Sequence, residues 1–246
     1  MTFLPRQLLT FGGAWIALVS FGLPAWGAAD GGFTAPTGAT IEGRVIFRGT
    51  VPLPQVLPVT RNQEICGKTL SIQTMIVDPK SGGVKDTVVS LVLHEGSVMP
   101  ISDQPSSTPT VTNRTCAFHP RVGMAKPGDL LETRNEDPVM HNTHIHADNR
   151  TFLNVALVAG GRPVQKKVRS PGLMKVTCDA HPFMHAFVMV SDHDFVATTD
   201  ALGRFSIIGV PPGKHEISLW HETLGPLKKQ VTIPPLGTVT VTIEYP

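Results

Sequence analysis

Apolar and polar positions alternate along several short stretches of the chain, which is the pattern of half-buried β-strands. The stretches with this alternation or with a run of β-branched residues are 41–47, 87–93, 204–208, 216–220 and 239–243. Residues typical of turns separate them, as at 126–129 and 210–213. No stretch shows a clear 3.6-residue apolar period. We therefore expect an all-β protein.

The composition agrees with short strands joined by turns. Glycine accounts for 23 and proline for 22 of the 246 residues, and both residue types interrupt long helices. Charged residues make up 16% of the chain, where about 25% is typical, and this argues against an intrinsically disordered protein. The formal net charge is only +2 and no basic run is present, so we expect no nucleic-acid partner.

Residues 1–27 have the features of a secretory signal peptide. Arg6 supplies one positive charge, residues 8–26 are apolar and uncharged, and small residues follow at 27–29. We expect cleavage near this last segment, a periplasmic or secreted protein, and no stable membrane insertion after cleavage. A retained membrane anchor is the alternative. The rest of the sequence has no second apolar stretch of spanning length.

Residues able to bind a metal are concentrated in the middle of the chain, where seven of the ten histidines fall between His119 and His193. One constellation occupies residues 135–146, and the other reads Cys-Asp-Ala-His-Pro-Phe-Met-His over residues 178–185. A thiolate, two imidazoles and a thioether form the ligand set of blue-copper centres. The candidate copper ligands are His141, Cys178, His181 and Met184.

The loop from Cys178 to Met184 resembles the ligand loop of the cupredoxins, most closely that of the amicyanin type, which reads Cys-x-x-His-Pro-Phe-Met. Upstream residues follow the same family pattern, in the order Gly128-Asp129, Asn135, His141-Asn142 and His144. The two motifs fall within residues 111–191, about a third of the chain. The resemblance implies a cupredoxin Greek-key β-sandwich or barrel for residues 111–192.

The resemblance also implies one type 1 copper site. It makes His141, Cys178 and His181 the equatorial ligands and Met184 the axial ligand. His185 directly follows Met184 and is the alternative for the axial position. The family pattern assigns no role to the other histidines of this region.

Three further interpretations of the same residues remain open. Cys178-x-x-His181 is also half of a structural zinc site, cysteine and histidine form nucleophilic pairs in some enzymes, and a cupredoxin can lack copper. A zinc site would need a second Cys or His pair of suitable spacing, which the sequence does not show.

Copper oxidases and nitrite reductases commonly carry a histidine beside the cysteine ligand, whereas Thr177 and Asp179 flank Cys178. We therefore expect no enzymatic activity.

The segments that flank the copper domain resemble a second type of β-domain. The turns at 199–205 and 210–213 resemble those of carboxypeptidase-regulatory-like modules and of the fibronectin-III-like domain of rhamnogalacturonan lyases. The expected division is a signal peptide at 1–27, an N-terminal β segment at 38–97, a linker at 98–110, a cupredoxin domain at 111–192 and a small β-sandwich at 193–246. The N-terminal β segment either completes the last sandwich, with the copper domain inserted between them, or packs on the copper domain. The whole pattern resembles copper proteins of the methylamine-utilisation type.

The copper interpretation also predicts how the cysteines pair. It reserves Cys178 for the metal, and an oxidising compartment favours a disulfide between the other two, Cys66 and Cys116. Such a bond would enclose 49 residues and stabilise the fold by roughly 4 kcal/mol. Two buried unpaired cysteines are the alternative.

The leading functional hypothesis is an exported blue-copper protein that carries single electrons between redox proteins. We expect transient docking of these partners at an apolar patch around an exposed edge of His181, formed with Pro182, Phe183 and residues 138–140. The alternative is a non-redox binding or scaffold module for a carbohydrate or a protein, in which copper is structural or stored. A reversible redox couple distinguishes the two hypotheses.

Overall fold

The computed structural model describes residues 2, 38–92 and 108–246. The predicted signal peptide lies outside these residues except for Thr2, and so does most of the predicted linker. The described part of the chain contains eighteen strands and one four-residue helix, which confirms the all-β fold class. No helix in these described ranges is long and apolar enough to cross a membrane.

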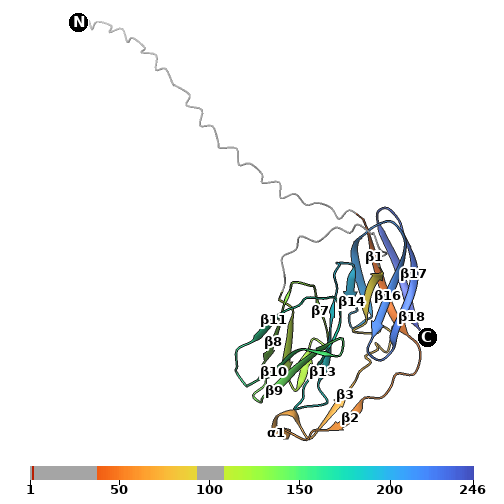
Figure 1. Cartoon of the computed structure of the whole chain (residues 1–246). Coiled ribbons are helices and arrows are strands. Elements are labelled where there is room, and N and C mark those ends of the chain that lie inside the picture. Colours follow the sequence, from red (N-terminus) through yellow and green to blue (C-terminus); the bar gives the residue numbers. More distant parts are fainter. Residues whose placement is uncertain (1, 3–37, 93–107) are drawn as a thin grey trace. The chain divides into compact units, whose positions relative to one another are not determined.

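The histidine-rich sandwich, residues 110–190, has two sheets that enclose one core (Figure 1). The first has the order β10-β9-β12-β13-β7, with bounds Arg150–Leu157, His141–Ala147, Gly172–Thr177, His185–Val190 and Val122–Ala125. The second has the order β11-β8-β5-β6, with bounds Val164–Lys167, Leu130–Asn135, Thr110–Arg114 and Ala117–His119. Apolar side chains of both sheets share the core, among them Leu131 on β8 and Val176 on β12.

The terminal sandwich is built from strands that precede and follow the histidine-rich one. Its first sheet has the order β15-β1-β18, with bounds Arg204–Val210, Ala39–Phe47 and Thr238–Tyr245. Its second sheet has the order β14-β4-β16-β17, with bounds Val196–Thr198, Val88–Val92, Gly213–His221 and Gly225–Ile233. All five strands that the alternation predicts belong to this sandwich, because its longer strands have one buried and one exposed face.

The pairing of β1 with β15 requires a glycine. Gly43 lies opposite Phe205, and a Cβ atom at Gly43 would lie 2.2 Å from the Phe205 ring. The ring therefore packs across β1 only because residue 43 has no side chain. Phe205 is itself 6% exposed and belongs to the core of the terminal sandwich.

A short segment of the N-terminal region packs on the other core. The cap segment, residues 55–72, contains β2 (Gln55–Pro58), α1 (Gln63–Cys66) and β3 (Thr69–Ile72), and its two strands pair with each other. Val59 and Cys66 are part of the core of the histidine-rich sandwich. The predicted disulfide between Cys66 and Cys116 is present, so the cap segment is bonded covalently to the turn between β5 and β6.

Candidate metal centre

Strand pairing brings the predicted ligands together from two parts of the chain. His141 is the first residue of β9, and Cys178 directly follows β12. Because β9 and β12 are antiparallel neighbours, with His144 opposite Thr177, these two ends lie at the same edge of the sheet. His181 lies three residues further on, in the turn that joins β12 to β13.

The turn between β12 and β13 is closed by its own backbone. The Cys178 N–H donates to the Met184 carbonyl at 3.3 Å, and the Met184 N–H donates to the His181 carbonyl at 2.9 Å. The His181 N–H in turn donates to the Cys178 carbonyl at 3.3 Å. The short spacing between these residues therefore produces a tight loop that holds a thiol and an imidazole on one side of the sandwich.

Three buried donor atoms converge there, one each from His141, Cys178 and His181. We call these residues the His–Cys–His group. The two Nδ1 atoms are 3.1 Å apart, and the Cys178 Sγ lies 3.6 Å from the His181 Nδ1. All three ligand atoms lie within 4.8 Å of one another. The exposed fractions of these residues are only 0, 2 and 1%.

The outer nitrogens of the two rings fix which nitrogen carries the proton. The His141 Nε2 donates to the Asp137 carboxylate at 2.9 Å, and the His181 Nε2 donates to the Asn62 side-chain oxygen at 3.2 Å. Both Nδ1 atoms are then unprotonated and face each other with their lone pairs. Two lone pairs at this distance repel in a buried site, so the arrangement suits a cation bound by both nitrogens.

Burial keeps both imidazoles neutral. It lowers the pKa of His141 below the usual value of 6.5, and hydrogen bonding and charge at Asp137 oppose this only in part. It also lowers the pKa of His181, where the neighbouring His141 and Arg61 act in the same direction. Neutral imidazoles are the form that binds metal ions, so no proton has to be displaced from either ring near neutral pH.

Asp137 is a supporting residue for which the sequence pattern indicates no role. Its carboxylate accepts the His141 Nε2–H, the Thr115 N–H at 2.6 Å and the Cys116 N–H at 2.9 Å. The only available signal was its position four residues before His141, within the quoted 135–146 motif. Asp137, Cys116 and His141 also form a second cluster of metal-binding residue types, but the Cys116 sulfur is committed to the disulfide.

Asn142 connects the two halves of the site. Its backbone N–H donates to the Cys178 Sγ at 3.4 Å, and its side-chain oxygen accepts from the Asp179 N–H at 3.2 Å. The Asn142 side chain therefore ties the strand that begins at His141 to the turn that follows Cys178. The contact also places one hydrogen-bond donor directly on the sulfur.

The two candidates for the axial position lie in different surroundings. Met184 is 2% exposed and belongs to the core beneath the turn. The His185 ring instead contacts Arg121, and its Nε2 lies 3.2 Å from the Glu222 carboxylate. The side chain of His185 is therefore already engaged outside the His–Cys–His group.

The expectation of an exposed His181 edge is wrong. His181 is 1% and Phe183 7% exposed, whereas Pro182 between them is exposed. The physical reason is the cap segment, whose Asn62 contacts the outer nitrogen of His181. This contact joins residues that are 119 positions apart, so no local pattern indicates it.

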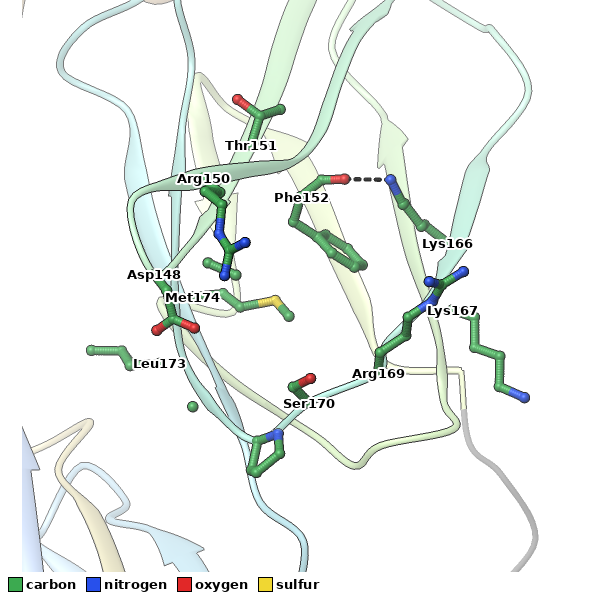
Figure 2. A pocket seen from close by; sticks show the side chains of 13 residues that line it. Asp148, Arg150, Thr151, Phe152, Lys166, Lys167, Arg169, Ser170, Leu173 and Met174 are labelled. Atoms are coloured by element: carbon green, nitrogen blue, oxygen red, sulfur yellow. Dashed lines mark hydrogen bonds between the residues drawn. The ribbon is translucent and has the colours of Figure 1, made fainter.

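A basic cleft of about 460 Å³ lies at the other end of β9 and β12. Figure 2 shows it between the β9–β10 turn and the segment that leads into β12. Its cationic lining residues are Arg150, Lys166, Lys167 and Arg169. The Lys166 Nζ donates to the Phe152 carbonyl at 2.5 Å (dashed line in Figure 2). Because Ala147 and Gly172 line the cleft while His141 and Cys178 mark the opposite strand ends, it is separate from the His–Cys–His group.

Comparison with solved structures finds partial similarity to copper proteins. A Cu-containing nitrite reductase from Thermus scotoductus SA-01 is 20% identical over 42% of this chain and 25% of its own, with a TM-score of 0.33. An oxidized mutant of amicyanin is 21% identical over 35% of this chain and 95% of its own, with a TM-score of 0.31. A purple cupredoxin from Nitrosopumilus maritimus is 21% identical over 35% of this chain and 100% of its own, with a TM-score of 0.30. The chain thus spans a quarter of the nitrite reductase. No protein-family model and no curated protein matches it.

Proposed function

We propose that the histidine-rich sandwich is a cupredoxin-type electron-transfer domain that holds a single type 1 copper ion. His141, Cys178, His181 and Met184 would hold this ion. The observation that carries this proposal is the buried convergence of two imidazole Nδ1 atoms and one thiol Sγ within 4.8 Å of one another. A soft thiolate with two imidazoles is the donor set of blue-copper sites, and copper bound there supplies a one-electron couple.

A structural zinc site is a poorer fit to the same residues. Such sites bind zinc with four cysteine or histidine side chains. Among the described residues, the His–Cys–His group offers only three ligands of these types. Cys116 belongs to the neighbouring cluster, but its sulfur is bonded to Cys66 and is not a thiolate.

The chain's own residues keep the ligands in place. Asp137 orients the His141 ring and Asn62 orients the His181 ring, each through the Nε2–H. The Asn142 N–H stabilises negative charge on the Cys178 sulfur, and hydrogen bonds to this sulfur tune the reduction potential of blue-copper sites. A ligand set fixed by strands and a closed turn changes little between oxidation states, which favours rapid electron transfer.

The proposal extends to the setting of the domain. The signal-like pattern of residues 1–27 and the Cys66–Cys116 disulfide support export to the periplasm or secretion. The partners are then redox proteins of that compartment. The terminal sandwich is proposed as a non-catalytic module of the carboxypeptidase-regulatory-like type, and we propose no enzymatic activity for the chain.

Copper titration of the purified protein tests this function. We expect a single equivalent of Cu(II) to give an intense visible band from thiolate-to-copper charge transfer, and a reversible couple in voltammetry. Cys178→Ser should keep the β-sheet circular dichroism and lose the band, because a hydroxyl is a poor equatorial ligand. A band that persists in this variant contradicts the assignment of Cys178. A band without a reversible couple favours the storage or scaffold alternative.

A further inference from the structure

The cap segment covers the outer edge of the His–Cys–His group. Its Asn62 oxygen accepts a hydrogen bond from the His181 Nε2 at 3.2 Å, and His181 is only 1% exposed. Residues 59 and 66 of the same segment are buried in the core of the histidine-rich sandwich. The edge of the His181 ring that carries Nε2 therefore faces the cap segment and not bulk water.

The backbone around Asn62 presents its side chain in a defined direction. Asn62 has φ 54° and ψ 40°, the left-handed region that asparagine tolerates better than most residues. Its carbonyl accepts the backbone N–H groups of Ile65 at 3.0 Å and Cys66 at 2.8 Å. The neighbouring Gln63 Nε2 donates to the Val59 carbonyl at 2.6 Å. These bonds close the turn from which the Asn62 side chain projects.

One disulfide links the two parts of the chain that hold the His141 and His181 rings. Asp137, which orients His141, accepts the backbone N–H of Cys116 at 2.9 Å. Cys116 is bonded to Cys66, the last residue of α1, and Asn62 is the residue just before that helix. The disulfide thus joins the segment that carries Asn62 to the turn whose Cys116 N–H bonds to Asp137, although the two are distant in sequence.

We propose that Asn62 is a positioning residue for His181, and that the cap segment is a cover that limits access of water and solutes to the His–Cys–His group. This inference rests on the proposed function insofar as the group is a metal site. By accepting the Nε2–H, Asn62 selects the tautomer in which Nδ1 keeps its lone pair for a ligand bond. A redox partner then meets the cap segment before it meets His181.

Two substitutions at the same position test the role of Asn62. Asn62→Gly removes the amide without straining the left-handed backbone, whereas Asn62→Asp keeps an acceptor oxygen. Asn149→Gly is the matched control, because Asn149 also has a positive φ of 61° and lies in the β9–β10 turn, at the far end of β9 from His141. These three variants are first studied metal-free with the disulfide intact.

Two measurements on the metal-free protein do not depend on copper. The first is the rate at which the Cys178 thiol reacts with dithionitrobenzoate, and the second is the His181 tautomer from its ring nitrogen chemical shifts. Asn62→Gly should raise the rate about fivefold to tenfold, as for the loss of one buried hydrogen bond. It should also replace the single Nε2–H tautomer with a mixture. Asn62→Asp and Asn149→Gly should behave like the unchanged protein.

An unchanged rate together with an unchanged tautomer in Asn62→Gly overturns the proposal. If this variant does not fold, the double variant Cys66→Ser/Cys116→Ser replaces it, because a cover released from the disulfide must also expose Cys178. An unchanged thiol rate in the folded double variant overturns the proposal as well.

Copper binding separates this inference from the proposed function. In the copper-loaded protein, Asn62→Gly should weaken copper affinity by roughly 10- to 100-fold, as for other residues that orient metal ligands. If copper titration of the unchanged protein fails while Asn62→Gly raises the Cys178 thiol rate and mixes the His181 tautomers, the proposed function is rejected and the proposed cover is kept. A normal copper band with an unchanged thiol rate and tautomer rejects the cover and keeps the function.

Discussion

At the residue scale, neighbouring side chains hold the His–Cys–His group in place, and Asp137 is one of them. Asp137 is 6% exposed, yet its carboxylate is stabilised because it accepts hydrogen bonds from three N–H groups. A buried charge of this kind is tolerated only where such bonds replace hydration. The same carboxylate determines the tautomer of His141. Asp137 therefore contributes both to the stability of the fold and to the ability of His141 to bind a metal.

We predict that Asp137→Ala destabilises the metal-free protein by about 3 kcal/mol, because it leaves the N–H donors of Thr115, Cys116 and His141 without their acceptor, and the last two are buried. Urea unfolding followed by circular dichroism measures this. Asp148→Gly is the control, since Asp148 is an exposed aspartate of the same sandwich and glycine tolerates its positive φ of 48°. Equal small effects of the two substitutions would show that the Asp137 hydrogen bonds contribute little.

At the element scale, the β12–β13 hairpin and the cap segment perform different tasks. The hairpin delivers Cys178 and His181 through bonds within a single turn. The cap segment has two strands of four residues each and a four-residue helix, so it has little core of its own. It depends on burial of side chains such as Val59 against the sandwich, and on the disulfide, to stay in place.

We predict that the double variant Cys66→Ser/Cys116→Ser loses about 4 kcal/mol of unfolding free energy, because the intact bond restricts the unfolded chain. The two cysteines are 50 positions apart in sequence, which makes the closed loop long. Urea unfolding with and without reductant measures this. Reductant should destabilise the unchanged protein and Cys178→Ser alike, and should leave the double variant unaffected. A response of the double variant to reductant would contradict this account.

At the scale of the whole molecule, neutral buried histidines occur in both sandwiches. Burial lowers the pKa of His141 and His181 in one sandwich, and of His221 at the end of β16 in the other. The His221 Nδ1 accepts the backbone N–H groups of Thr223 at 3.1 Å and Leu224 at 3.3 Å. Protonation of the His221 Nδ1 would remove both hydrogen bonds at a buried side chain, since His221 is only 2% exposed.

We predict that the metal-free protein becomes less stable as the pH falls from 7.5 to 5.5. The unfolded chain binds protons on these histidines near their usual pKa of 6.5, whereas the folded chain binds them only at lower pH. The stabilising contribution is therefore complete above about pH 6.5 and declines below it. His221→Asn keeps an acceptor but does not titrate, so its unfolding free energy should vary less with pH. Identical pH profiles would exclude a contribution of His221.

Much of the candidate site could be predicted from local sequence. Cys178 and His181 are three residues apart, so any tight turn that follows a strand brings them together. The terminal strands were predictable for a similar reason: in β18, polar and apolar residues alternate with the period of a strand. The strands of the histidine-rich sandwich gave a weaker signal, because several are short and carry polar side chains on buried positions, as Asn113 and Thr133 show.

Sequence alone therefore determined the all-β class and the proximity of Cys178 and His181 in one turn, because these depend on residues close together in the chain. Tertiary structure alone decided that His141 lies beside Cys178 through β9–β12 pairing, that Asp137 bonds to His141, and that Asn62 contacts His181. It also decided the parallel pairing of β1 with β18, whose residues are about 200 positions apart. Contacts of this kind arise from packing and strand register over the whole chain, and neighbouring residues carry no local signal for them.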